Sequence, residues 1–227
     1  MKTKLLAFIL ILTVLVPQTF AQKRRTKIDS GIQFGILGGI GMQSFIGKDF
    51  NGNKLNYNLT PSFHIGVNAS LNLAPDLFFQ LGLSYITKGA KQELLEDMIR
   101  TIRLSYIEMP LNILYRPQLG DGHILLGVGP YAAYGIMGKE RVKIETITTE
   151  LSVKFLSDAS EEPATYAYYR APDAGVNILF GYEFYSGIFL HLNGQMGLLK
   201  VNPSYDISND PTSKKNLGFG LSVGYRF

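Results

Sequence analysis

The sequence predicts an all-β chain that closes into an eight-stranded antiparallel transmembrane β-barrel, with short periplasmic turns and long extracellular loops. Three observations predict this fold. Eight segments alternate apolar with small or polar residues, as a strand with two different faces does. The connections between these segments are short and long in turn. No segment after the N-terminus resembles a transmembrane helix, because glycine or polar residues interrupt every apolar run.

The N-terminus has the pattern of a cleavable export signal. Lys2 and Lys4 precede an apolar run over residues 5–16, and small residues at alternate positions follow, ending at Ala21. The apolar run is shorter than the roughly 20 residues that a membrane-spanning helix needs. We therefore expect residues 1–21 to be a signal peptide that is cleaved after Ala21. A retained N-terminal anchor is the alternative.

Beyond the signal, residues 22–30 are expected to form a periplasmic tail and residues 31–227 a single barrel domain. The chain has no cysteine, which excludes a disulfide framework, a thiolate metal site and a lipidated cysteine. Without the two lysines of the signal, 20 basic residues face 18 acidic ones. This near-neutral balance does not indicate nucleic acid as a partner.

The first four expected strands differ in how clearly they alternate. Residues 32–41 are the weakest, because glycine occupies both faces. In residues 63–73, apolar side chains from Phe63 onward alternate with His, Gly, Asn and Ser. In residues 77–87 the opposite face carries Gln, Gly and Ser, and in 105–115 it carries Tyr, Glu and Asn. Since successive side chains of a strand point to opposite sides, each segment has one apolar face.

The last four expected strands follow the same rule. Residues 124–134 and 188–198 alternate more loosely, whereas 174–184 oppose apolar side chains to Gly, Asn and Glu. Residues 217–227 alternate without a break, with Leu, Phe, Val and Tyr on one face and Gly, Ser and Arg on the other. Each segment has about the 9–11 residues that a tilted strand needs to cross a bilayer.

The polar faces decide which side meets lipid. They consist mostly of Gly, Ser, Asn and Gln with isolated charges, which suits a narrow packed lumen, so the long apolar side chains point outward. A soluble barrel would instead carry Lys and Glu on its outer face. If the apolar faces pointed inward, the chain would be a periplasmic, lipocalin-like binding protein.

The connections are expected to alternate in length. The short turns are residues 74–76, 117–122 and 185–187. The long loops are residues 46–61, 88–103, 136–172 and 200–215. Short turns on one side and long loops on the other are typical of outer-membrane barrels, and an even number of strands places both termini in the periplasm. Within the second loop, residues 92–103 fit either a short helix or an extension of the following strand.

Three segments resemble a known family. Leu104–Tyr115, with its Tyr-Ile-Glu-Met-Pro run, resembles a strand of the outer-membrane β-barrel family common in Bacteroidetes, whose members are often labelled porin-family or PorT-like. Asp173–Glu183 resembles a later strand of that family and Asn216–Phe227 its closing strand. The resemblance implies a small eight-stranded barrel of OmpX-like architecture, in a family whose members mostly lack an assigned activity.

The C-terminus resembles a sorting signal. Val223, Tyr225 and Phe227 alternate up to the last residue, and this pattern looks like the signal that the barrel-assembly machinery reads. A plain lipid-facing role for Phe227 is compatible with that interpretation.

Several charged or titratable side chains fall on the polar, inward face. They are Glu108, Arg116, Asp173, Glu183, Arg226, His64 and His191. A narrow lumen cannot leave acids unpaired, because a buried charge is costly without a partner. We therefore expect Arg226, with Arg116 or a histidine, to pair with Glu108 and Glu183 as an interior plug. A proton or ion path is the alternative.

The long loop 136–172 is the candidate interaction surface. Its spaced apolar residues predict a β-ribbon that projects above the membrane, followed by Tyr166, Tyr168, Tyr169 and Arg170. An exposed strand edge can pair with an extended partner, and Tyr and Arg are favoured in recognition surfaces. The expected partner is an extracellular protein or a glycan. The alternative places these tyrosines in an outer aromatic girdle.

The sequence favours a structural or interaction protein of the outer membrane of a Gram-negative bacterium. Its expected partners are outer-membrane lipid and the barrel-assembly machinery, with no nucleic acid, metal or cofactor. A narrow pore or a component of a secretion apparatus is the second interpretation. An enzyme is the third and is not expected, since the three histidines His64, His123 and His191 form no His-Ser-acid or Asp-His grouping at the extracellular rim.

Overall fold

A computed structural model describes residues 31–95, 98–163, 165–205 and 211–227. The expected signal peptide and periplasmic tail lie outside the described residues. The first five strands are β1 (Ile32–Lys48), β2 (Thr60–Ala74), β3 (Leu77–Leu95), β4 (Met98–Tyr115) and β5 (Gly122–Ile144). The other five are β6 (Ile147–Phe155), β7 (Ala167–Tyr169), β8 (Pro172–Phe184), β9 (Ile188–Gly197) and β10 (Ser213–Arg226).

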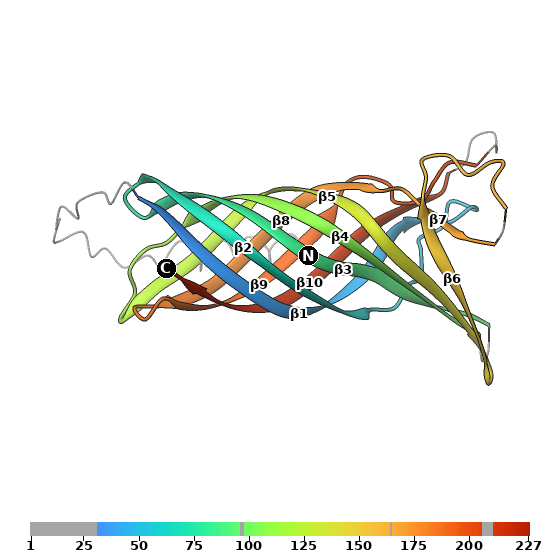
Figure 1. Cartoon of the computed structure of the whole chain (residues 1–227), viewed down its shortest axis with the longest axis horizontal. Coiled ribbons are helices and arrows are strands. Elements are labelled where there is room, and N and C mark those ends of the chain that lie inside the picture. Colours follow the sequence, from blue (N-terminus) through green and yellow to red (C-terminus); the bar gives the residue numbers. More distant parts are fainter. Residues whose placement is uncertain (1–30, 96–97, 164, 206–210) are drawn as a thin grey trace, which may run out of the picture.

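Eight of these strands form a closed ring, which confirms the predicted barrel. Along the ring, β1 pairs with β2, β2 with β3, β3 with β4, and β4 with β5. β5 then pairs with β8, β8 with β9, β9 with β10, and β10 with β1, which closes the ring. Every pairing within the ring is antiparallel. β6 and β7 lie outside the ring at one end of the barrel, at the right of Figure 1. Because the ring is closed, its strands leave no backbone edge to face lipid.

The apolar faces point outward, as the alternation predicts. On β2, Ile65 is 62% exposed, whereas the neighbouring inward-facing Asn68 and Ser70 are buried. The same contrast recurs on β10, where Phe219 and Val223 are exposed and Ser222 is buried. An apolar outer surface with a polar interior is the reverse of a soluble barrel. The part of the chain that the structure describes has no helix that is long and apolar enough to cross a membrane.

Short turns gather at the end where the C-terminus lies, at the left of Figure 1. They join β2 to β3, β4 to β5 and β8 to β9. In the first of them Asp76 takes a left-handed conformation with φ of 61°, which aspartate tolerates in tight turns. The opposite, extracellular end carries the longer connections.

The prediction of a long loop over residues 88–103 is wrong, because β3 and β4 continue as paired strands as far as Leu95 and Met98. Lys91 lies opposite Thr101, and β4 pairs in turn with an extension of β5 that reaches Ile144. Residues 98–103 are therefore strand and not helix, as are the described residues 92–95. The helical spacing of their apolar residues was overridden because β5 supplies a hydrogen-bonding partner along the whole length. Together, β3 to β6 form a ribbon that projects beyond the barrel on one wall (Figure 1).

Two apolar clusters lie at different levels of the otherwise polar interior. The cluster near the extracellular end includes Phe45, Ile102, Leu104, Tyr106 and Tyr131. The cluster near the short turns consists of Phe78, Leu114, Leu125 and Phe189, with Leu37 and Leu179 packed against it. Polar side chains occupy the space between and beyond them, so an eight-stranded lumen is filled by its own side chains.

Candidate functional site

The first polar group lies inside the barrel near the short turns. Glu183 accepts from Arg116 Nη1 at 3.1 Å and from Arg226 Nε at 2.8 Å, so one carboxylate joins two guanidinium groups. Arg226 Nη1 also donates to Ser70 Oγ at 2.8 Å, and Arg116 Nη1 donates to Gln33 Oε1 at 2.9 Å. Buried arginine and glutamate need such extra hydrogen bonds to offset their desolvation. The arrangement ties β1, β2, β8 and β10 to the end of β4.

A second charged group lies in the lumen, farther from the short turns than the first. Lys88 Nζ lies 2.7 Å from Glu108 Oε2 and 3.0 Å from Asp173 Oδ2, and its side chain has no exposed surface. The ammonium also lies 4.1 Å from the centroid of the Tyr131 ring. Two acids share one cation here, so the group carries a formal charge of −1. This Lys88 cluster links β3, β4 and β8 across the barrel.

Neutral side chains complete the Lys88 cluster. Tyr131 Oη and Asn216 Nδ2 both donate to Asp173 Oδ2, at 3.2 and 2.8 Å. Gln195 Nε2 donates to Glu108 Oε1 at 2.6 Å. These donors give both buried acids hydrogen-bond partners in addition to the Lys88 ammonium, which offsets part of the cost of burying them.

The structure changes the pairing that the sequence predicted. Arg116 and Arg226 both contact Glu183, but neither is paired with Glu108, which binds Lys88 instead. Within the described part of the chain, neither His64 nor His191 forms an ion pair with an acid: His64 Nε2 lies 2.8 Å from Ser222 Oγ, and the His191 ring stacks on Phe189.

Lys88 was missed because the expected strand ended one residue too early. The inward positions of β3 are even-numbered, from Gln80 through Ser84. Extending the alternation by one step past Thr87 would have placed Lys88 inside the barrel. A signal for it was therefore present in the sequence.

The described lumen holds little empty space. One cavity of about 70 Å³ is lined by residues that include His64, Glu108, Asn177 and Gln195. A second, of about 10 Å³, lies beside Arg226 and the lower apolar cluster. These volumes hold a few water molecules and one at most, respectively. The layers of side chains between them plug the barrel.

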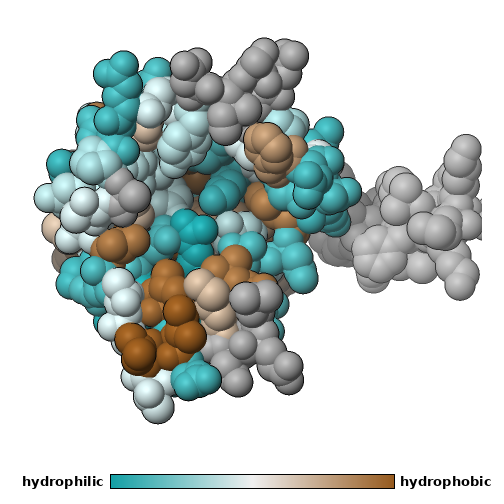
Figure 2. Space-filling view, turned by 90° about the vertical axis from the view of Figure 1, so that its right-hand side faces the viewer, coloured by the Kyte–Doolittle hydropathy of each residue, from teal (hydrophilic) through white to brown (hydrophobic). Residues whose placement is uncertain are grey.

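A larger cavity lies at the extracellular mouth, and we call it the vestibule. Its volume is about 500 Å³. Its aromatic lining consists of Phe50, Tyr166, Tyr168, Tyr169 and Tyr205. Its charged lining consists of Arg100, Glu140, Glu162 and Lys214. Figure 2 looks onto this end of the molecule, where hydrophilic side chains predominate over a smaller hydrophobic group at the lower edge.

An ion pair with a tyrosine forms the floor of the vestibule. Arg100 Nε lies 2.6 Å from Glu140 Oε1, and Tyr169 Oη donates to Glu140 Oε2 at 2.9 Å. Burial, together with the nearby Glu140 carboxylate, raises the pKa of Tyr169 well above its usual value, so the phenol stays protonated and keeps donating. Beneath this floor, Ile102 and Leu104 are fully buried.

The tyrosines of the long loop do not form the expected exposed surface. Tyr168 is 8% exposed and Tyr169 2% exposed, because β7 pairs in parallel with β6 and folds back over the mouth. Tyr166 is half-buried, and Lys154 Nζ lies 3.8 Å from the centroid of its ring. Arg170, also half-buried, donates to Ser204 Oγ at 2.8 Å. The projecting ribbon is present as predicted, but the tyrosines that follow it in the chain line the vestibule.

The predicted assembly-signal residues lie on the outside of the barrel. Val223 is 53%, Tyr225 42% and Phe227 69% exposed. Val223 and Tyr225 face lipid on β10, and Phe227 directly follows that strand, close to the short turns. Among the described residues, no three His, Asp or Glu side chains are grouped so that they could hold a metal ion.

Sequence comparison finds one protein family. The family described as "Outer membrane protein beta-barrel domain" matches residues 20–202. No curated protein sequence matches the chain.

Several solved structures are similar in strand arrangement at low sequence identity. Ail, the attachment invasion locus protein of Yersinia pestis, solved in complex with the heparin analogue sucrose octasulfate, is 12% identical with a TM-score of 0.40, covering 86% of this chain and 99% of that one. OprG from Pseudomonas aeruginosa is 12% identical with a TM-score of 0.49, covering 87% and 97%. The N-terminal β-barrel domain of Pseudomonas aeruginosa OprF is 14% identical with a TM-score of 0.27, covering 85% and 97%.

Proposed function

The chain belongs to the outer membrane protein β-barrel domain family and is a small β-barrel protein of the bacterial outer membrane, and from this premise we propose that it is a surface-binding protein. In this proposal the plugged barrel is the anchor, and the vestibule with its surrounding loops receives an extracellular ligand. The chemistry of the function is recognition, without transport and without catalysis.

The observation that carries the proposal is that the vestibule is open outward and closed beneath. Phe50, Glu162 and Tyr205 line it and are exposed at the surface. Its floor is the buried Glu140 with its two partners, and packed apolar side chains follow below. A cavity that opens outward above a closed floor can hold a ligand, whereas a transport path also needs an exit.

The lining favours a protein or a glycan as the ligand. Aromatic rings give flat apolar contact area with little loss of side-chain entropy, and the half-buried Arg100 and Lys214 supply donors at fixed places. The ribbon beside the mouth adds a second contact surface. Its tip exposes Ile144 and Ile147, at 48% and 70%. Among the described residues, the outer edge of residues 147–152 has no strand partner, so it can pair with an extended segment of a protein.

Conductance tests the anchoring part of this proposal. The refolded mature protein in a planar bilayer should show no discrete conductance steps, because the lumen is filled. Steps that persist across preparations would refute the plugged-anchor proposal and favour the second candidate, a narrow pore or secretion-associated component.

Binding tests the recognition part. We would screen the wild-type protein against immobilised glycans and surface proteins. For any ligand found, Tyr166→Ala and Phe50→Ala should lower the affinity about tenfold, since each removes an aromatic contact. Tyr134→Ala, on the lipid-facing wall, is the matched control. Equal affinity of all three variants and the wild type would remove the vestibule from the proposal.

The absence of catalysis is part of the proposal. His64 and Ser222 are a histidine–hydroxyl pair, but they lie buried beside a cavity of about 70 Å³. That volume is too small for a lipid or peptide substrate. Release of fatty acid from labelled lipid by the wild type, lost in Ser222→Ala, would contradict this.

The finer family assignment and the assembly partner are also proposals. The run from Tyr106 to Pro110 on β4 supports placing the chain with the PorT-like barrels of Bacteroidetes. The outward row of Val223, Tyr225 and Phe227 supports recognition of β10 by the barrel-assembly machinery.

A further inference from the structure

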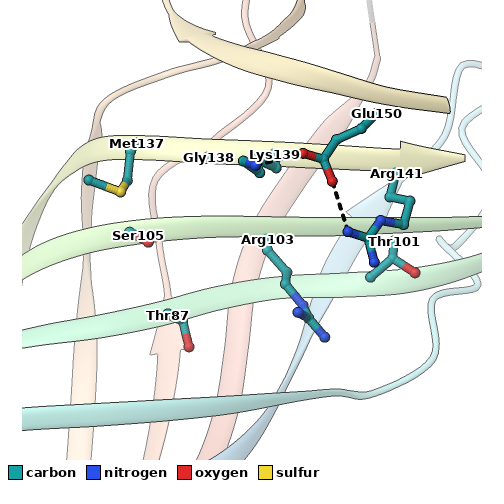
Figure 3. A pocket seen from close by; sticks show the side chains of 9 residues that line it. All are labelled: Thr87, Thr101, Arg103, Ser105, Met137, Gly138, Lys139, Arg141 and Glu150. Carbon is teal, nitrogen blue, oxygen red and sulfur yellow. Dashed lines mark hydrogen bonds and ion pairs between the residues drawn. The ribbon is translucent and has the colours of Figure 1, made fainter.

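A groove lies on the outer face of the ribbon, away from both the lumen and the vestibule. It has a volume of about 320 Å³. The residues that matter for its chemistry are Thr101, Arg103, Lys139, Arg141 and Glu150. Figure 3 shows them on three adjacent strands, β4, β5 and β6, with the basic side chains gathered over one stretch of sheet.

The pairing register explains why these cations meet. Arg103 lies opposite Lys139, and Thr101 lies opposite Arg141, so four outward side chains form two adjacent cross-strand pairs. Arg141 in turn lies opposite Glu150 on β6. Directly opposite residues on one face have Cβ atoms about 5 Å apart. The groove is therefore a regular feature of the sheet.

The groove begins where the lipid-facing band ends. On β4 the outward residues Met109 and Ile107 are exposed and apolar, and Arg103 follows two outward positions later. On β5 the exposed Tyr134 and Met137 precede Lys139. The change from apolar to basic occurs at the same level on both strands. Since strands of outer-membrane barrels carry their apolar band across the hydrocarbon, the basic residues lie at the level of the outer headgroups.

The groove keeps a positive charge despite its acid. Glu150 lies 2.6 Å from Lys139 Nζ and 2.8 Å from Arg141 Nη2, and hydrogen bonds from Lys139 and Arg141 lower its pKa to about 2. Glu150 is therefore ionised at neutral pH and neutralises one of the three cations. Arg103 is exposed, and no described carboxylate lies within ion-pair distance of it. Two positive charges remain for an external anion.

We propose that this groove binds the phosphate of a phosphorylated glycolipid in the outer leaflet of the membrane. Arg103 and Lys139 contact the phosphate oxygens, and Glu150 holds Lys139 and Arg141 in place beside it. A guanidinium matches the geometry of a phosphate with paired N–H donors, and an ammonium adds a point charge. A headgroup is the expected source of the phosphate, because the lower border of the groove, which includes the exposed Met137, is the lipid-facing band itself.

The test uses the folded full-length mature protein in detergent, with three probes. These are lipid A carrying both phosphates, lipid A with both phosphates removed, and inorganic phosphate alone. Retained lipid is counted by native mass spectrometry, and the temperature of the heat-modifiable gel shift gives a second readout. Bisphosphorylated lipid A should remain bound and raise that temperature, whereas the other two probes should do neither.

Two charge-matched variants make the test specific to the groove. The triple variant Arg103→Gln, Lys139→Gln, Arg141→Gln should lower the affinity for bisphosphorylated lipid A at least tenfold. The control variant Lys54→Gln, Lys200→Gln, Lys215→Gln removes three extracellular-end charges outside the groove and should bind as the wild type does. Binding that is unchanged in the groove variant, equal binding of dephosphorylated lipid A, or equal protection by inorganic phosphate would each overturn the proposal. None of these outcomes bears on conductance or on the vestibule, so the surface-binding proposal is tested separately.

Discussion

Replacing Lys88 with methionine should cost this barrel a large part of its stability. The ammonium has no exposed surface and lies within 3.0 Å of one oxygen of Glu108 and one of Asp173. Lys88→Met keeps the approximate volume of the side chain but leaves two facing carboxylates without their cation. Breaking a buried ion pair by removing one partner costs roughly 3–5 kcal/mol, because the other charge stays buried. Water does not screen this ion pair appreciably, since the side chains involved are almost fully buried.

Urea unfolding of the protein in lipid vesicles, followed by the gel shift, measures this loss. With a slope of about 2 kcal/mol per molar urea, a loss of ~4 kcal/mol lowers the midpoint by roughly 2 M. The triple variant Lys88→Met, Glu108→Gln, Asp173→Asn removes all three charges and should recover most of the loss, because no unpaired charge remains. Glu108→Gln alone leaves the pair of Lys88 with Asp173 and should cost about 1.5–3 kcal/mol. Lys54→Met, at an exposed position, is the control.

A midpoint for Lys88→Met within experimental error of the wild type would refute this reasoning. So would a triple variant that is as unstable as the single one, since packing and not charge would then explain the loss.

The remaining predictions concern other parts of the barrel. Glu183→Gln leaves two buried guanidinium groups facing each other and should lower the free energy of unfolding by roughly 3 kcal/mol. The gel-shift temperature should fall accordingly, and an unchanged temperature would contradict this. Gly39→Leu should reduce refolding yield, because a Cβ there would clash with the backbone carbonyl of Leu221 and would lie 2.6 Å from the His64 ring. Gly194→Ala meets nothing closer than 3.4 Å and should refold normally. Phe227→Ser should lower the amount of folded barrel in cells and leave refolding in detergent unchanged; equal loss in both would mean a purely structural role. The Glu150 carboxyl, followed by NMR, should stay ionised as the pH falls from 7 and should titrate near 2. Because the pKa of Glu150 is lower in the folded protein, the stabilisation from its ion pairs with Lys139 and Arg141 is fully present above pH 4.5 and is lost as the pH falls toward 2. Titration near 4.5 would show that these ion pairs are absent.

The fold could be predicted because strand alternation is a local property of the sequence. Glu183 and Arg226 were assigned to the lumen from parity alone, and both are buried there. Closure then follows from chemistry, since an open sheet edge in hydrocarbon leaves backbone groups unpaired. These arguments need no knowledge of which strand lies where.

Partners inside the lumen could not be predicted in the same way, because they depend on register and on strand length. Arg226 reaches Glu183 across β9, a strand that contains neither residue. Glu108 takes Lys88 because β3 continues past its apolar alternation. A shift of one residue would have exchanged the inner and outer faces of a strand, but several registers that differ by two residues keep the faces and change every partner.

The vestibule could not be predicted from local sequence patterns, for a different reason. Tyr168 and Tyr169 are buried because three residues of β7 pair with the end of β6. That parallel contact bridges a loop with little apolar alternation, and nothing in the neighbouring sequence specifies it. The sequence alone therefore predicts that the same two tyrosines belong to an exposed recognition surface.

The seam between β1 and β10 has a consequence for the order of folding. These strands pair from Gly35 with Arg226 to Lys48 with Ser213, joining the two ends of the domain. Such contacts have the largest sequence separation in the barrel, so the entropy cost of loop closure is highest for them. Each hairpin between consecutive strands can form earlier at lower cost. We therefore expect β1 and β10 to pair last. Several glycines along this seam, including Gly41 and Gly220, leave few bulky side chains that must rearrange as the two strands meet.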